Sequence, residues 1–122
     1  MLIKDVTDLD IYNESFKLLN NLYNLLKRVP KTKYDTIIQF KKCGKSIPAN
    51  IAEGWAKRSS ALEFKRFLKI SLGSSDELIT HLRTLIITAP YLSVESQALI
   101  ESYKVLSKRI NALHSVWKSG PI

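Results

Sequence analysis

The chain has little of the chemistry that catalytic and metal sites need. Its 122 residues include one cysteine, Cys43, and two histidines, His81 and His114. A lone cysteine excludes a disulfide within the chain, fits a reducing cytoplasm, and is expected here as a small helix-packing residue. The histidines lie on different predicted helices without metal-ligand spacing to Cys43, so we expect no metal site and no cofactor. With no Gly-rich phosphate loop or Glu-x-x-His pair, we also expect no enzymatic activity and no small-molecule substrate.

Long apolar runs are absent as well. No stretch approaches the roughly 18 consecutive apolar residues of a membrane span. The opening MLIKDVTDLD has acidic residues where a signal peptide needs an apolar core. We therefore expect a cytoplasmic protein without a membrane partner. Hydrophobic residues make up 45% and charged residues 25%, which fits a single globular domain over residues 1–122.

Apolar residues recur at steps of three and four along four segments, the spacing of amphipathic helices. The expected buried residues are Leu9, Tyr12, Phe16, Leu19, Leu22 or Tyr23, and Leu26 in the first segment; Ile37, Phe40, Gly44, Ile47, Ile51 and Trp55 in the second; Phe64, Phe67, Leu68, Ser71, Ser75, Leu78, Leu82, Leu85 and Ile86 in the third; and Leu99, Tyr103, Leu106, Ile110, Leu113 and Trp117 in the fourth. Short predicted loops make successive helices antiparallel, so the pattern predicts an all-α, up-down-up-down four-helix bundle.

Pro48 lies inside the second predicted helix, at about residues 32–57. Proline removes a hydrogen bond and crowds the carbonyl four residues earlier, that of Gly44, whose missing side chain eases a bend. We predict a continuous helix kinked at Pro48, with two consecutive helices as the alternative. Small residues at 71–75 predict that another helix approaches closely there, so Pro48, Gly44 and residues 71–75 would mark the joint between the second and third helices.

Acidic residues are few: 11 stand against 19 lysines and arginines, for a net charge of +8. Residues 31–69 include ten basic and three acidic residues, a net charge of +7. A solvated surface is one interpretation of such charge, and a polyanion partner is the other. The candidate phosphate-binding residues are Lys41, Lys42, Lys45, Lys57, Arg58, Lys65, Arg66 and Lys69.

Two blocks of sequence carry a family resemblance. Residues 46–59 read SIPANIAEGWAKRS and residues 63–78 read EFKRFLKISLGSSDEL. In order and spacing they resemble the bacterial four-helix bundle proteins called 23S rRNA intervening-sequence proteins. The resemblance implies a homopentamer with a role in RNA binding. The chain is also similar to the accessory variability proteins of diversity-generating retroelements, which implies an alternative: a scaffold that binds a reverse transcriptase and its template RNA.

The residues of the first block also predict structural roles. We interpret Ser46, Pro48, Asn50, Glu53 and Gly54 as a structural motif. Asn50 and Glu53 share one helix face beside the apolar stripe, and buried polar groups need partners. We therefore predict a partly buried Glu53 that pairs with a basic or hydroxyl group on the third helix, with Arg66 and Ser74 as candidates. The rival interpretation makes Asn50 and Glu53 an active or binding site. Trp55 and Trp117 are expected in the core or at a subunit contact, with base stacking by Trp55 as the alternative.

Overall fold

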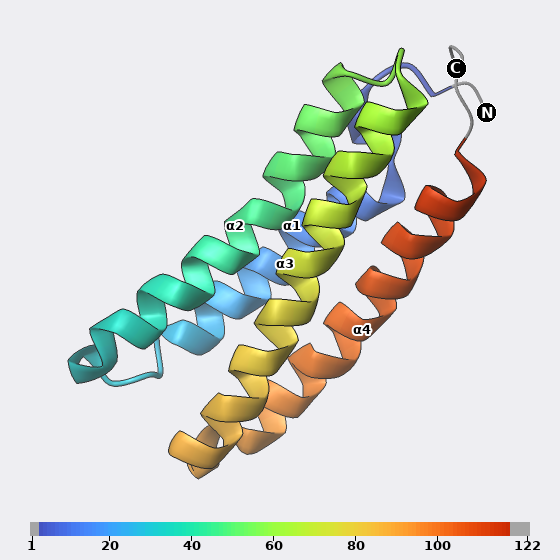
Figure 1. The fold of residues 1–122 in the computed structure, drawn as a ribbon. Helices are drawn as coiled ribbons and strands as arrows, with labels where there is room; N and C mark the ends of the chain where they lie inside the picture. The colour runs from blue at the N-terminus through green and yellow to red at the C-terminus, as the bar shows by residue number, and fades with distance from the viewer. Residues whose placement is uncertain (1–2, 118–122) are drawn as a thin grey trace.

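Four long helices make up most of residues 3–117, which are the residues that the computed structural model describes (Figure 1). The helices are α1 (Asp10–Leu26), α2 (Tyr34–Ala56), α3 (Ala61–Thr88) and α4 (Ser93–Val116). Short 3-10 turns precede three of them: η1 (Val6–Asp8), η2 (Lys31–Lys33) and η3 (Pro90–Leu92). No strand occurs in residues 3–117. The predicted all-α fold with four helices is confirmed.

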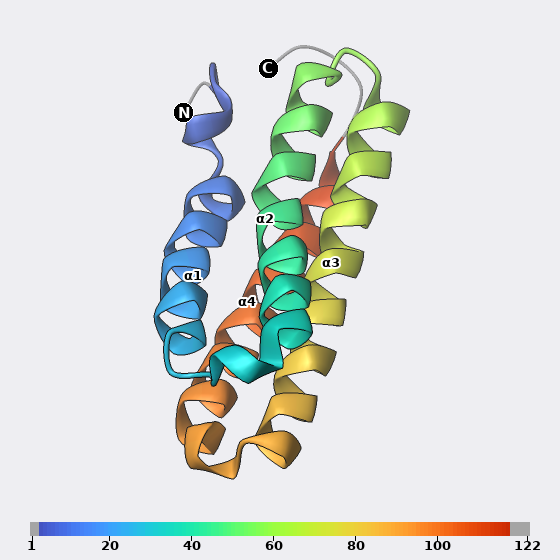
Figure 2. The same ribbon diagram turned by 90° about the vertical axis from the view of Figure 1, so that its left-hand side faces the viewer.

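The helices pack side by side. Helix α3 contacts both α2 and α4, and α1 contacts α2 and α4 from the other side (Figure 2). The α2–α3 turn lies at the same end of the bundle as the start of α1 and the end of α4 (Figure 1). Within the described residues, none of the helices combines the length and the apolar character that a membrane crossing needs.

The predicted core of α2, α3 and α4 is largely confirmed. Phe40, Ile47, Ile51, Phe64, Leu68, Leu78, Leu82, Tyr103, Leu106 and Ile110 are fully buried. Trp55 and Trp117 are also buried and meet Phe64 in a T-shaped aromatic cluster, with ring centroids 4.5 Å apart for Phe64 and Trp117. These long helices bury one stripe each, so the spacing of their apolar residues identifies the buried face.

The predicted face of α1 is wrong at its centre. Phe16 is 45% exposed and packs its ring edge against Tyr12, whereas Ile11, Leu18 and Leu25 are buried. Apolar residues occupy more than one face of this short helix, and periodicity alone cannot select among them. The contacts of α1 with α2 and α4 select the face that carries Leu18 and Leu25.

Helix α2 continues through Pro48, as predicted, and the bend there stays a prediction. Gly44 was expected at the contact between α2 and α3, but it lies at the contact between α2 and α1. A methyl group on Gly44 would lie 2.9 Å from side-chain carbons of both Leu19 and Leu22, which belong to α1. The absence of a side chain at Gly44 therefore allows α1, not α3, to approach α2 closely.

Candidate nucleic-acid interface

A line of polar contacts joins α2 to α3 through the sequence motif. The hydroxyls of Ser46 and Ser74 lie 2.8 Å apart, and the Asn50 amide donates to the carbonyl oxygen and the hydroxyl of Ser46 at 2.8 and 2.9 Å. Deeper in the seam, the buried Ser71 hydroxyl donates to the Ile47 carbonyl at 2.9 Å. These bonds satisfy polar groups that burial would otherwise leave unpaired, so this part of the motif holds the two helices in register.

Gly54 gives the same seam its closest approach. A methyl group on Gly54 would lie 2.8 Å from Phe67 Cβ and 3.3 Å from the Phe64 carbonyl oxygen. Both atoms belong to or sit next to the α3 backbone and cannot swing away. By contrast, a methyl group on Gly73 would meet no atom within 4 Å. Of the predicted small-residue stretch, Ser71, Ser74 and Ser75 face neighbouring helices and Gly73 faces outward.

The predicted role of Glu53 is wrong. Its side chain is 56% exposed and forms an ion pair with Lys57, one turn further along the same helix, at 3.7 Å. Arg66, the expected partner, is bonded instead to Glu63 on its own helix at 2.9 Å, and Ser74 is bonded to Ser46. A partner one turn away on the same helix is within reach however α2 and α3 are aligned. Glu53 forms this local pair instead of one between helices.

The structure separates the eight predicted basic residues into three groups. The first, the α2 lysines, comprises Lys41, Lys42 and Lys45. The ammonium of Lys41 lies 5.1 Å from the Tyr23 ring centroid on α1, while Lys42 and Lys45 are exposed. None of the three forms an ion pair within the described part of the chain, so their charge is available to a partner.

The second group lies at the α2–α3 turn and is partly neutralised. Lys57 and Arg66 form the ion pairs with Glu53 and Glu63 described above. Arg58 stacks over the Trp55 ring at 4.1 Å and donates a hydrogen bond to the Trp55 carbonyl at 3.0 Å. These cations cover the aromatic end of the core as well as facing solvent.

The third group, Lys65 and Lys69, lies on the side of α3 that faces α4. Burial lowers the pKa of His114 on α4, and the positive charges of Lys69 and then Lys65 lower it further. Neither lysine has an acidic partner within residues 3–117, so both charges disfavour the protonated form of His114. An anion bound near the two lysines would offset this effect.

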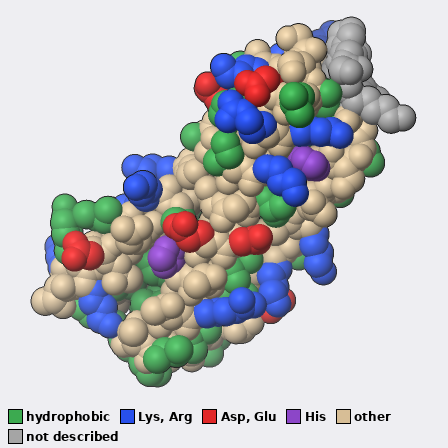
Figure 3. Space-filling view, in the orientation of Figure 1, with side chains coloured by type: hydrophobic (Ala, Val, Ile, Leu, Met, Phe, Trp, Pro, Cys, Tyr) green, Lys and Arg blue, Asp and Glu red, His purple; other side chains and the backbone are tan. Residues whose placement is uncertain are grey.

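Seen from the α2–α3 side, basic side chains form separate groups, interrupted by acidic ones (Figure 3). Six of the eight predicted residues make no ion pair within the described chain, and Lys57 and Arg66 are the exceptions. We name the outward surface of α2 and α3 that includes the α2 lysines, Lys65 and Lys69 the basic face. Spaced cations of this kind suit phosphates along a backbone rather than one compact anion.

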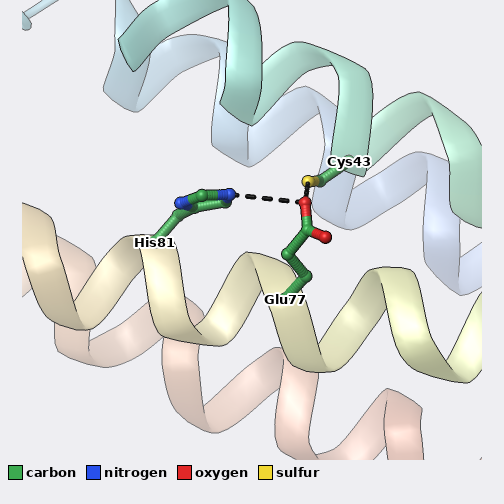
Figure 4. A group of neighbouring side chains, drawn as sticks. All are labelled: Cys43, Glu77 and His81. Carbon is green, nitrogen blue, oxygen red and sulfur yellow. Dashed lines mark hydrogen bonds and ion pairs between the residues drawn. The ribbon is translucent and has the colours of Figure 1, made fainter.

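Between α2 and α3, beside the α2 lysines, lies a side-chain cluster that the sequence did not indicate. The thiol of buried Cys43 on α2 donates to the Glu77 carboxylate on α3 at 2.6 Å, and His81 Nε2 lies 3.4 Å from the same oxygen (Figure 4). Burial, and then the Glu77 carboxylate, raises the pKa of Cys43 to about 12. Neither histidine has metal-ligand spacing to Cys43 along the chain, yet helix packing brings His81 close to it. The spacing of Glu77 and His81, one helical turn apart, was visible in the sequence, but their proximity to Cys43 depends on how α2 and α3 are aligned.

These observations define a small four-helix protein with a polar interhelical seam and a basic outer face. A family model described as 23S rRNA-intervening sequence protein matches residues 7–112. The chain belongs to this family. No curated protein matches it.

Proposed function

We propose that this chain is a non-enzymatic RNA-binding module that contacts phosphates through its basic face. It is built as an up-down-up-down bundle with α2 bent at Pro48, and it acts as a homo-oligomer, a pentamer by its resemblance to the family. The observation that carries the proposal is the set of exposed or half-buried lysines without an ion-pair partner in residues 3–117. Membership of a family named for a ribosomal RNA insertion supports RNA as the polyanion.

Lysine ammonium groups bind phosphate as point charges and release condensed counterions, without reading base sequence. The proposal therefore predicts affinity that falls steeply as salt rises and depends little on sequence. One chain presents few such contacts. Several copies around a symmetry axis would repeat the basic face, so that weak contacts add through avidity.

Exposed apolar side chains support self-assembly. At the end of the bundle that holds the α3–α4 connection, Ile87 is 79% exposed, Tyr91 58% and Val94 77%. A cluster of large apolar side chains on one end is typical of a protein contact surface. We propose that copies of the chain contact one another there, which leaves the basic face free.

The proposal is tested by removing charge in two matched places. The triple variant Lys41→Gln, Lys42→Gln and Lys45→Gln removes three charges from the basic face. The control, Lys104→Gln, Lys108→Gln and Arg109→Gln, removes three exposed charges from α4. Affinity for a labelled single-stranded RNA is measured by fluorescence anisotropy at several salt concentrations. We expect the α2 triple to lose affinity and to reduce the salt slope by about 0.7 for each lost phosphate contact, with a smaller change in the control.

Equal losses in both triples would show that net charge alone matters and would overturn the assignment to the basic face. Absence of RNA binding by the wild-type oligomer at about 0.15 M salt would overturn the RNA proposal. In that case a protein partner, such as a reverse transcriptase, becomes the occupant to test. Mass measurement in solution checks the oligomer independently of both.

A further inference from the structure

Cys43, Glu77 and His81 bring three different metal-ligating atoms together. The Cys43 sulfur, a Glu77 carboxylate oxygen and a His81 ring nitrogen all lie within 4.8 Å of one another. Two of the residues are one turn apart on α3 and the third projects from α2, so the atoms converge from both sides of the seam (Figure 4). We propose that these three side chains bind a zinc ion.

The spacing suits tetrahedral zinc. Zinc bonds of about 2.3 Å to sulfur and about 2.0–2.1 Å to nitrogen and oxygen place neighbouring ligand atoms about 3.3–3.7 Å apart. The His81 nitrogen already lies 3.4 Å from the Glu77 oxygen. The Cys43 sulfur lies closer to that oxygen, at 2.6 Å, in the contact where the thiol proton faces the carboxylate. Replacing that proton by zinc requires the two atoms to part by about 1 Å, which side-chain rotation on two helices can provide.

The state of His81 is a second, independent observation. Its Nε2 atom is buried, and its 3.4 Å contact with the Glu77 oxygen does not amount to a well-formed hydrogen bond. The ring packs edge-on against Phe40, with centroids 5.8 Å apart, which holds the nitrogen toward the cluster. A buried ring nitrogen without a hydrogen bond is costly, and a metal bond would satisfy it.

The three donors also match zinc in charge and kind. A thiolate and a carboxylate balance the two positive charges of the ion, and sulfur with imidazole nitrogen selects zinc over magnesium or calcium. The thiol proton leaves to solvent as the sulfur–zinc bond forms. Lys42 lies near Cys43 and Glu77 and opposes the ion, but its ammonium is exposed and screened by water. The Glu77 side chain is 59% exposed, so water can reach the ion and supply the fourth ligand.

The site joins α2 to α3, and zinc binding therefore stabilises the folded chain. The experiment uses the full-length untagged protein, freed of metal with a chelator and titrated with Co²⁺ as a spectroscopic probe and with Zn²⁺. We expect one ion per chain, the visible bands of tetrahedral Co²⁺ with a thiolate-to-metal band in the near ultraviolet, and a melting temperature raised on the order of 10 °C at a hundredfold excess over Kd.

Three variants and a control complete the test. Cys43→Ala, Glu77→Gln and His81→Gln each remove one ligand, and each should weaken Zn²⁺ binding at least about 100-fold, because even indirect supporting contacts in metal sites are worth 10–100-fold. His114→Gln removes the other histidine and should leave binding unchanged. Circular dichroism checks that each variant keeps its helix content; His81 is part-exposed, so its variant remains informative if Cys43→Ala unfolds.

Absence of the thiolate-to-metal band would overturn the proposal. So would Zn²⁺ affinity that survives in the Cys43 and His81 variants, since binding would then lie elsewhere. RNA binding is measured separately with chelator present, so a failure of the zinc site and a failure of the RNA proposal give different results.

Discussion

Helix α1 and the α2–α3 seam are held in the bundle by different kinds of contact. In the seam, Ser46 bonds to Ser74 and Ser71 bonds to the Ile47 carbonyl, and these two contacts fix how far α2 can slide along α3. No hydrogen bond in residues 3–117 joins α1 to another α-helix, and buried leucines hold it in place, with Leu22 fully buried. Apolar contact is strong but non-directional, whereas hydrogen bonds specify register. The proposed RNA and zinc sites both lie on the pair of helices whose register is fixed.

The largest expected effect comes from the apolar side of this comparison. Replacing Leu22 with Ala removes a fully buried side chain between α1 and α2, and we expect a loss of about 3 kcal/mol in the free energy of unfolding. Urea denaturation measures the change. Leu62→Ala is the control, because Leu62 is 80% exposed and its loss should change stability by less than about 0.5 kcal/mol. Similar values for the two variants would show that α1 does not depend on this packing.

Alanine substitutions at two glycines test the two regions directly, because Gly54 lies against α3 and Gly44 lies against α1. Gly54→Ala places a methyl group 2.8 Å from Phe67 Cβ beside the α3 backbone, and we expect it to destabilise the fold by about 1–3 kcal/mol. In Gly44→Ala the methyl group meets the flexible ends of Leu19 and Leu22, so steric cost and the gain in helix propensity, about 1 kcal/mol, should nearly cancel.

Gly73→Ala is the matched control for both glycine variants. Its methyl group would meet open space on α3, so the gain in helix propensity alone should stabilise the protein by up to about 1 kcal/mol. Thermal melting of the three variants ranks them. A Gly54→Ala protein as stable as Gly73→Ala would contradict the close approach of α2 and α3.

The hydrogen bonds of the seam should have smaller effects. Ser71→Ala removes the buried donor to the Ile47 carbonyl and should lower stability by about 1 kcal/mol. Ser74→Ala removes a half-buried contact with Ser46, where water can substitute, and should cost less. Chemical denaturation distinguishes them, and a greater loss for Ser74→Ala would place the main polar contact at the rim instead of the interior.

The smallest effect concerns pH at the other edge of the basic face. Burial, Lys69 and Lys65 lower the pKa of His114 in the folded protein, so the unfolded chain takes up a proton first as pH falls. This contribution to stability is complete at pH values above the unfolded pKa, about 6.5, and is lost as pH falls from there through the lower folded pKa. We expect His114→Gln to reduce the loss of stability between about pH 7.5 and 5.5, measured by urea denaturation. An unchanged pH slope would show that the lysines do not act on His114.

RNA provides a second measurement on the same residue. If phosphates bind near Lys65 and Lys69, they should raise the pKa of His114, which nuclear magnetic resonance of the ring can follow. A His114 pKa that does not change at saturating RNA would place the RNA elsewhere on the basic face.

Sequence predicted the parts of this fold that depend on regular spacing. Ile47, Ile51 and Trp55 were expected in the core of α2 and are buried there. On α1, where apolar residues occupy several faces, the spacing selected Phe16, and packing against the other helices selected Leu18 instead. Periodicity thus identifies a helix reliably. It identifies the buried face of that helix only when the apolar stripe is narrow.

The candidate site was predictable in charge but not in arrangement. The excess of lysine and arginine in residues 31–69 is a property of the sequence, and so is the motif at Ser46 and Asn50. Glu53 pairs locally with Lys57, whereas the division of the lysines into groups and the meeting of Cys43 with His81 depend on helix rotation and register. Side chains distant in sequence meet only once α2 and α3 are aligned, and no local pattern fixes that alignment.

The aromatic cluster has a practical consequence for studying this protein. Both tryptophans of the chain, Trp55 and Trp117, lie with Phe64 at the end of the bundle that holds the α2–α3 turn. Tryptophan fluorescence, excited selectively, therefore reports on that end, whereas far-ultraviolet circular dichroism averages over all four helices. Unfolding curves from the two signals coincide only if the bundle unfolds in one cooperative step. A fluorescence transition at lower denaturant would show that the ends of α2 and α4 separate while the opposite end of the bundle remains folded.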